Sequence, residues 1–300
     1  RCPRCRNGHF MKMVPVIKRY LEITALLMMT VCLAAGCAKK GNADLAYSNQ
    51  RYSYDEKEVF SCDSWTRYDK EYLEKLKADY ELEKLVANCG NDFERVQAVT
   101  EWVTNLWAHN GDNIPEQNDP LSILHNVTEE GEQYRCVEYG VVISGCLNAL
   151  GIPTRTLGLK TQDVETREYG AGHVAAEAYI KDLKKWVFID GQWGIIPVMD
   201  GMPLNAVQLS EVLEHPGSYD TPVEFLSFQG GGAGGYAEWI SEYLYYFDCT
   251  GYTCTKDGLQ ETSLMLTPAD AENPKIFQVN YPLEIDIYTD SVPAFYPPAT

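Results

Sequence analysis

The hydrophobic pattern of this chain changes its period at Gly151-Ile152-Pro153, and no other feature constrains the fold as much. Upstream, apolar and small residues recur at helical steps over residues 136–149, and the glycine and proline that follow favour the end of that helix. Downstream the period is two, which is typical of strands, over residues 154–160, 174–180 and 186–189. A helical part followed by antiparallel strands predicts an α+β fold.

Three more helices are expected before this segment. Leucines and a tyrosine recur at three- and four-residue steps up to residue 86, and Cys89-Gly90-Asn91 ends that helix. Asn91 with Glu94 three positions later is a capping-box pattern, so the next helix begins there and buries one face as far as residue 106. Asp119-Pro120 indicates the start of a short helix through Leu124. We interpret these apolar stripes as core.

Beyond residue 191 the pattern is weaker. Residues 195–201 suggest a hairpin, and Asn205 can cap a helix over residues 206–213. The glycine-rich run 228–235 is expected to be a loop, and residues 236–247 fit a helix or a strand equally. Strands are expected at residues 264–266, 277–281 and 284–288, which makes 228–300 a glycine-rich loop followed by a β-rich C-terminal segment.

Charge limits the possible partners. The chain carries a formal net charge of −18, which repels phosphate backbones and excludes nucleic acid as a natural partner. The glycine-rich run lacks the Lys-Ser/Thr ending of a phosphate loop, so it predicts no nucleotide site. We predict no cofactor and no bound metal.

The N-terminal residues indicate export. From Met11, basic residues precede an apolar run of about 16 residues, which is shorter than the roughly 20 that a spanning helix needs and favours a signal peptide over a membrane span. The run ends in LAAGC, which resembles a bacterial lipobox and implies a lipid anchor on Cys37. Residues 1–37 are therefore predicted to hold upstream residues and a lipoprotein signal peptide, and 38–56 a tether. Cys2, Cys5 and His9 look like half a zinc ribbon, but no second ligand pair follows, so we interpret them as an upstream artefact.

Cys136 opens the predicted central helix. The free N–H groups and dipole of a helix N-terminus favour a thiolate, which is the nucleophilic form of cysteine. His173 and Asp190 fall on the two following strands, at similar distances from the turn that joins them, so the sheet should bring them together. An imidazole next to a thiol and a carboxylate next to the imidazole form the arrangement of a cysteine-type catalytic triad.

Four motifs in order carry a resemblance to the bacterial transglutaminase-like superfamily: RCVEYG, GIPTR, GHVAAEAYI and KKWVFID. This resemblance implies a papain-like fold in which the cysteine opens a helix packed on a sheet, with a catalytic domain over residues 57–227. It implies Cys136 as nucleophile, His173 as general base and then acid, and Asp190 as the orienting carboxylate. The backbone N–H of Cys136 would help to form the oxyanion hole, with Trp107 or Gln133 as candidate second donors.

The chain departs from the family pattern at three positions. Gly140 replaces a small Ala or Ser, Ala175 replaces a Trp, and Gly-Gln follows Asp190 where Pro-Thr is usual. The missing indole at Ala175 leads us to expect a less covered acyl site. A less covered site would favour water as the acceptor.

Other reactive residues have structural readings that we prefer. Cys146, on the same helix as Cys136, is interpreted as a core thiol. Glu177 shares a strand face with His173, but no third ligand is evident, so a hydrogen-bonding role is favoured over a metal site. His109, His125 and His215 are interpreted as loop or surface residues. In an exported protein Cys249 could pair with Cys254, and a Cys62–Cys89 pair is a guess.

The expected function is cysteine-dependent acyl transfer or hydrolysis at amide bonds of a peptide or protein in the bacterial cell envelope, on the periplasmic or surface-facing side of a membrane. The alternative is a surface lipoprotein that uses the same fold to bind glycan or peptide without catalysis. The reactivity of Cys136 separates the two functions, because a binding module needs no activated thiol.

Overall fold

We describe a computed structural model of the chain at residues 51–55, 60–230 and 232–299. The predicted signal peptide, Cys37 and most of the predicted tether lie outside these residues, as do Cys2, Cys5 and His9. Within the described ranges, no helix combines the length and the apolar character that crossing a membrane requires.

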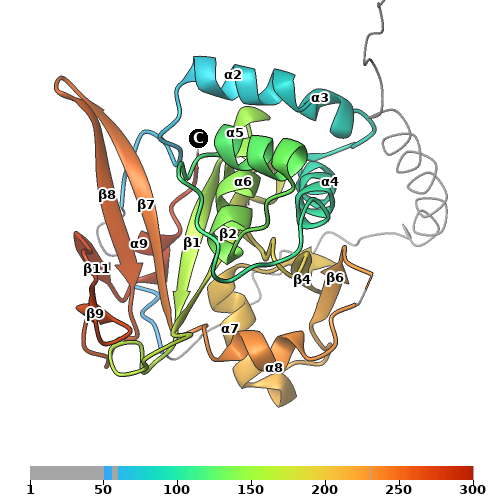
Figure 1. The fold of residues 1–300 in the computed structure, drawn as a ribbon. Helices are drawn as coiled ribbons and strands as arrows, with labels where there is room; N and C mark the ends of the chain where they lie inside the picture. Colours follow the sequence, from blue (N-terminus) through green and yellow to red (C-terminus); the bar gives the residue numbers. More distant parts are fainter. Residues whose placement is uncertain (1–50, 56–59, 231, 300) are drawn as a thin grey trace, which may run out of the picture. The chain divides into compact units, whose positions relative to one another are not determined.

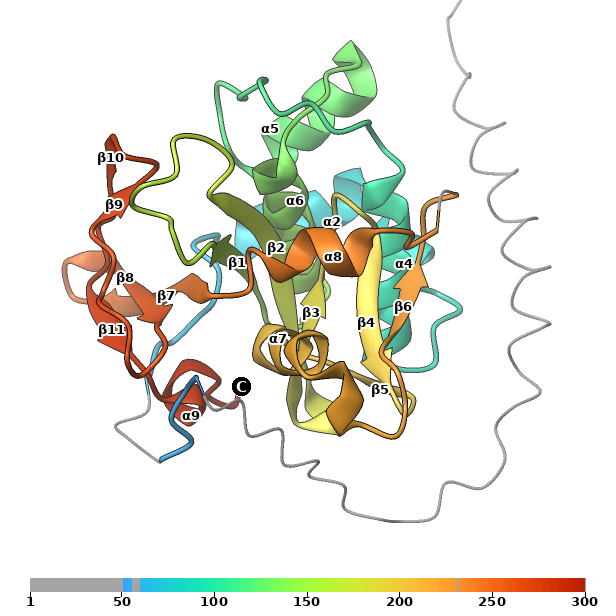
Figure 2. The ribbon, with the colours of Figure 1, turned by 90° about the horizontal axis from the view of Figure 1, so that it is seen from below.

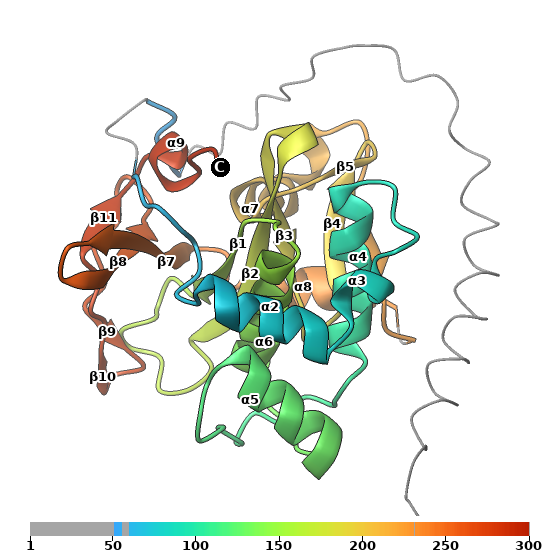
Figure 3. The same cartoon turned by 90° about the horizontal axis from the view of Figure 1, so that it is seen from above.

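The helical part surrounds α6 (Cys136–Ala149), whose residues contact α2 (Lys70–Asp79), α4 (Asp92–Thr104) and α5 (Pro120–His125). Figures 1 and 3 show these helices gathered on the side of β1 and β2 that α6 covers. Asn91 caps α4 through Glu94, and Asp119 caps α5, so both predicted helix starts are confirmed. A π-helical turn, Asn126–Glu130, extends α5.

The helix expected up to residue 86 is divided into two. Glu81 adopts a left-handed conformation, with φ at 50°, between α2 and α3 (Leu82–Leu85). A non-glycine residue seldom adopts this region, and no hydrophobic pattern reports it, because Leu82 continues the apolar stripe and is fully buried.

The main sheet has six strands in the order β11-β8-β7-β1-β2-β3. The three predicted strands are confirmed as β1 (Thr154–Lys160), β2 (Gly172–Ile180) and β3 (Lys185–Ile189), which pair antiparallel. Segment 228–300 adds β7 (Tyr246–Thr255), β8 (Gly258–Leu266) and β11 (Ile287–Thr289) to this same sheet, and β11 alone pairs in parallel, with β8. The α+β class is thus confirmed.

A second sheet, β5-β4-β6, flanks the first. The predicted hairpin is β4 (Ile195–Met199) with β5 (Met202–Pro203); β6 (Glu224–Ser227) pairs on the other side, and Asn205 caps α7 (Ala206–Glu214). Residues 236–247 combine both alternatives, because α8 (Tyr236–Ser241) is followed by the start of β7. In Figure 2, α8 crosses in front of β2 and β3.

Two expectations for the C-terminal segment are wrong. The stretch 277–281 is no continuous strand: residues 278–280 form a tight turn between β9 (Ile276–Phe277) and β10 (Tyr281–Pro282), with positive φ at Gln278 and Val279. Cys249 and Cys254 cannot pair, because both lie on β7 and five residues of an extended strand span about 16 Å. All six cysteines in the described residues are free thiols, including Cys62 and Cys89.

A fully buried ion pair joins β1 to β2. Arg155 and Glu177 are register partners with no exposed side-chain surface, and their Nη2 and Oε2 atoms lie 2.8 Å apart. The other carboxylate oxygen accepts hydrogen bonds from the backbone N–H of Ala206, at the start of α7, and from the Tyr296 hydroxyl. Four aromatic rings surround the guanidinium within 5.0 Å: those of Trp65, Trp186, Phe295 and Tyr296. The preferred structural reading of Glu177 is confirmed.

We expect Glu177→Ala to destabilise the fold by about 3–5 kcal/mol, because it leaves the Arg155 charge buried without a partner. Asp79→Ala is the matched control, since it breaks the exposed Lys75–Asp79 pair and should cost no more than about 0.5 kcal/mol. Urea unfolding of both variants measures the difference. Equal costs would contradict a structural role for the buried pair.

Candidate active site

A local ion pair holds the start of α6. The Glu138 carboxylate accepts hydrogen bonds from the backbone N–H of Arg135, at 3.0 Å, and from its guanidinium, at 2.8 Å. Glu138 is buried, and the arrangement fixes the turn immediately before Cys136. The pairing of Arg135 with Glu138, both in the motif RCVEYG, therefore holds Cys136 in the first turn of α6.

His173 and Asp190 meet as the strand register requires. His173 Nε2 and Asp190 Oδ2 lie 2.9 Å apart, and their side chains are 3% and 0% exposed. Asp190 directly follows β3 and accepts two further hydrogen bonds, from the Tyr236 hydroxyl at 3.0 Å and from the backbone N–H of Trp193 at 3.1 Å. Three donors thus hold a carboxylate that has no contact with solvent.

The thiol of Cys136 lies beside the same imidazole and interacts with it. Because Asp190 occupies Nε2, Nδ1 is the nitrogen available to the thiol. Burial by itself would lower the pKa of His173, but the charge of Asp190 and the hydrogen bonds from Asp190 and Cys136 raise that pKa from 6.5 to about 10. The structure therefore favours an imidazolium next to Cys136 at neutral pH.

The close approach of α6 to β2 explains Gly140. A Cβ at this position would lie 2.9 Å from the carbonyl oxygen of Ala175 and 3.0 Å from the side chain of Val174. Both residues follow His173 on β2, so this contact sets the separation of the thiol and the imidazole. Gly191, after Asp190, is equally confined, because its Cβ would lie 2.5 Å from Ile143.

The expectation that Ala175 leaves the acyl site less covered stays a prediction, but aromatic side chains do lie against the imidazole of the candidate triad. Ala175 is itself fully buried, and aromatic rings from a distant part of the sequence cover the imidazole. The ring of Trp239, on α8, packs edge-on to His173 at 4.9 Å between centroids, and the ring of Tyr243 lies at 6.0 Å. The size of residue 175 therefore gives no argument for water as the acceptor.

The two candidate oxyanion donors differ in their surroundings. Trp107 is 7% exposed, its ring stacks on Tyr139 at 4.1 Å, and its backbone carbonyl accepts the Tyr139 hydroxyl. Its Nε1–H is buried and finds no hydrogen-bond partner among the described residues. Gln133 is exposed. A buried, unpaired N–H group suits an oxyanion site better than a solvated amide.

Sequence reasoning missed Tyr236, whereas its assignment of His109 to the surface is confirmed, because His109 is exposed. Partial desolvation and the nearby charge of His173 lower the pKa of His109, so this exposed residue still lies within electrostatic reach of the candidate triad. Tyr236 belongs to a segment whose helix or strand state the pattern could not decide. Its spacing of three to Trp239, once helical, is the signal that would have placed both side chains on one face.

Other candidate groups have structural roles. Cys146 has no exposed surface, and burial raises its pKa strongly, as expected for a core thiol. In the described part of the chain, no three His, Cys, Asp or Glu side chains group as a metal site would require.

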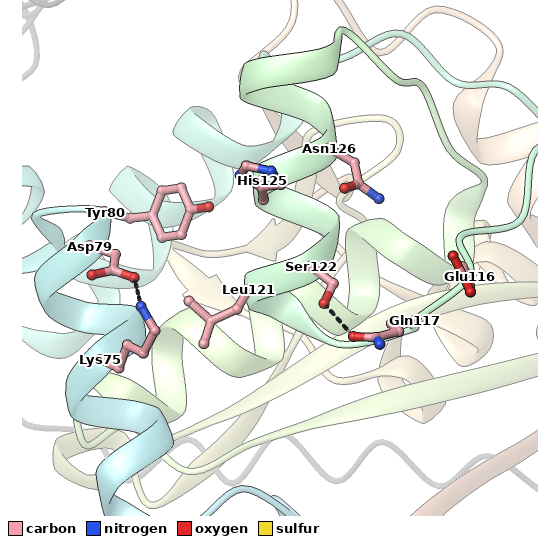
Figure 4. A pocket seen from close by; sticks show the side chains of 9 residues that line it. All are labelled: Lys75, Asp79, Tyr80, Glu116, Gln117, Leu121, Ser122, His125 and Asn126. Carbon is pink, nitrogen blue, oxygen red and sulfur yellow. Dashed lines mark hydrogen bonds and ion pairs between the residues drawn. The ribbon is translucent and has the colours of Figure 1, made fainter.

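His125 lies in a groove of about 380 Å³ between α2 and α5, where Lys75 pairs with Asp79 and Ser122 bonds Gln117 (Figure 4). Cys136 does not line this groove.

Comparison with solved structures gives only distant similarity. A protein from Cytophaga hutchinsonii proposed to be a cysteine protease is 16% identical, with a TM-score of 0.31, over 70% of this chain and 60% of its own. The periplasmic domain of TgpA from Pseudomonas aeruginosa is 17% identical, with a TM-score of 0.31, over 43% of this chain and 46% of its own. Red sea bream transglutaminase is 15% identical, with a TM-score of 0.30, over 65% of this chain and 34% of its own. The chain thus spans less than two thirds of the length of each.

No curated protein sequence matches the chain. A family model does match: the transglutaminase-like superfamily core aligns with residues 81–191, the segment from just before α3 to just after Asp190. That segment contains α6 with Cys136 at its start and the two strands that bring His173 to Asp190. Residues 81–191 of this chain are thus similar in sequence to the core of the transglutaminase-like superfamily.

Proposed function

We propose that the chain catalyses acyl transfer or hydrolysis at amide bonds of a peptide or protein substrate, with Cys136 as nucleophile. The observation that carries the proposal is the buried His173–Asp190 pair, with the half-buried Cys136 thiol close enough to the imidazole to raise its pKa. Burying a histidine and a carboxylate without solvent is costly unless they pair, and a purely structural core would more simply use apolar residues here.

The reaction would proceed through a thioester. The Cys136 thiolate attacks the amide carbonyl carbon, and the backbone N–H of Cys136 with Nε1–H of Trp107 stabilises the oxyanion that forms. The His173 imidazolium donates its proton to the leaving amine as the C–N bond breaks. A water molecule or a second amine then attacks the thioester while His173 accepts its proton, and the C–S bond breaks to restore the thiolate.

Asp190 would act through His173. Its charge stabilises the imidazolium, and its hydrogen bond at Nε2 turns Nδ1 toward the thiol. The membrane-facing location is part of the proposal: a lipid on Cys37 would hold the enzyme on the cell envelope, where peptides and proteins are available as substrates.

We expect iodoacetamide to label Cys136 at about pH 5.5, where exposed thiols without an imidazolium partner are almost fully protonated. Two thiols of the same chain serve as controls: Cys254 is exposed, and Cys146 is buried on the same helix as Cys136. Mass spectrometry of digested protein locates the label. Labelling of Cys254 or Cys146 with Cys136 spared would favour the non-catalytic glycan- or peptide-binding alternative.

We expect Asp190→Asn to keep the fold and to lower turnover by two or more orders of magnitude, because the imidazolium loses its charge partner. The pH dependence of unfolding provides a second readout. In the native chain, protonated His173 stabilises the fold fully below pH 6.5, and this contribution is lost as the pH rises through about 10. The variant should lack this alkaline loss. An unchanged stability profile would contradict the proposed coupling.

We expect Cys37→Ser to move the exported protein from the detergent phase to the aqueous phase and to abolish palmitate labelling, since a diacylated cysteine provides two-chain anchoring. Cys62→Ser, which changes a thiol of the folded domain, is the control and should keep both properties. If the Cys37→Ser protein partitioned into detergent as fully as the native chain, the anchor would be contradicted.

A further inference from the structure

The helix α8 and the residues just after it present aromatic side chains to the candidate triad at steps of three and four residues. Tyr236, Trp239 and Tyr243 follow this spacing, which places them on one face of the segment. Tyr236 contacts the carboxylate, and the rings of the other two lie against the imidazole. The segment lies outside the matched residues 81–191, so the family match assigns it no role.

The Tyr236 hydroxyl and the His173 imidazole bind the same oxygen atom of the Asp190 carboxylate. Asp190 Oδ2 accepts both His173 Nε2, at 2.9 Å, and the Tyr236 hydroxyl, at 3.0 Å, whereas Oδ1 accepts the Trp193 backbone N–H. Tyr236 has no exposed surface, so water does not compete for its hydroxyl. A donor that binds the same oxygen withdraws negative charge from the contact with His173.

The phenol cannot lose its proton in this place. Burial raises the pKa of Tyr236 well above its ordinary value, and the charge of Asp190 raises it further. The hydroxyl is therefore a permanent donor at physiological pH. The ring is held from several sides: Trp193 packs on it at 5.5 Å and Phe225 at 5.4 Å, so the direction of the donated hydrogen bond is fixed.

We propose that Tyr236 is a positioning residue that extends the series Cys136, His173 and Asp190 by one hydrogen bond and sets the charge that Asp190 presents to His173. It acts through Asp190 and does not touch the reacting atoms. This inference rests on the proposed function of Cys136, but its central measurement concerns the imidazole and does not require turnover.

Other titratable groups also face His173. Cys136 approaches from α6, His109 from the loop after α4, and Tyr243 from the segment after α8, where burial and the neighbouring Glu242 raise its pKa. Replacing Cys136 by Ala removes the thiol that interacts with the imidazole. The remaining groups are unchanged between the variants compared below, so a shift reports on residue 236.

The test is the NMR titration of His173 in the Cys136→Ala protein. Tyr236→Phe should move the midpoint of the His173 titration upward by as much as about one pH unit. Loss of the hydrogen bond leaves more negative charge on Oδ2, and the free energy of a hydrogen bond to a charged group is large enough for a shift of this size. Replacing Tyr236 by 3,5-difluorotyrosine, a stronger donor of nearly the same shape, should move it downward. The fluorinated protein keeps the test decisive even where Tyr236→Phe fails to fold.

Tyr296→Phe is the matched control, because it also removes a hydroxyl that donates to a buried carboxylate, that of Glu177 at 2.9 Å. It should cost stability and leave the His173 midpoint in place.

With Cys136 present, Tyr236→Phe should slow acetylation of Cys136 by p-nitrophenyl acetate on the order of tenfold, and Tyr296→Phe should slow it less than about twofold. Shifts of equal sign for the two Tyr236 replacements, or no shift, would overturn the positioning role. A native chain that is never acetylated would instead count against the proposed function.

Discussion

The close contact between α6 and β2 is the constraint on which the arrangement of the site depends. Gly140, one helical turn after Cys136, lies against the carbonyl group of Ala175 with no room for a Cβ, and Ala175 is two residues after His173. Helix and strand therefore approach at backbone distance, which brings the thiol close enough to the imidazole to raise its pKa. A larger residue at position 140 would have to displace β2, and with it the histidine.

Two buried carboxylates hold the strands around this contact in different ways. Glu177 neutralises Arg155 and gathers β1, α7 and the C-terminal aromatic residues around one ion pair. Asp190 is paired with His173 and takes its remaining hydrogen bonds from Tyr236 and the Trp193 backbone. The first pair is closed and stable, whereas the second can gain and lose a proton. This difference separates a structural carboxylate from one suited to chemistry.

Sequence patterns predicted the part of the fold that is organised locally. The change of period at Gly151-Ile152-Pro153 placed α6 and the three following strands within one or two residues, because caps, proline and alternation act over a few positions. The pairing of His173 with Asp190 followed from the turn between β2 and β3. The break at Glu81 escaped prediction, because its unusual φ leaves the apolar stripe intact.

What the sequence could not predict depends on contacts between distant segments. Trp239 packs against His173 from a segment more than sixty positions later in the chain. Tyr236 reaches Asp190 in the same way, from a stretch with no decisive period. Such contacts exist only after α8 packs across the sheet, and no local pattern records them.

Trapping of an acyl-enzyme tests the central claim most directly. The native chain is incubated with p-nitrophenyl acetate, quenched in acid, digested and analysed by mass spectrometry, with His173→Ala treated in parallel. The account predicts one acetyl group on the peptide that contains Cys136, formed rapidly in the native chain, lost again with time, and nearly absent from the folded variant. Acetylation of Cys136 at the same rate in both proteins, or none at Cys136 in the folded native chain, would contradict it.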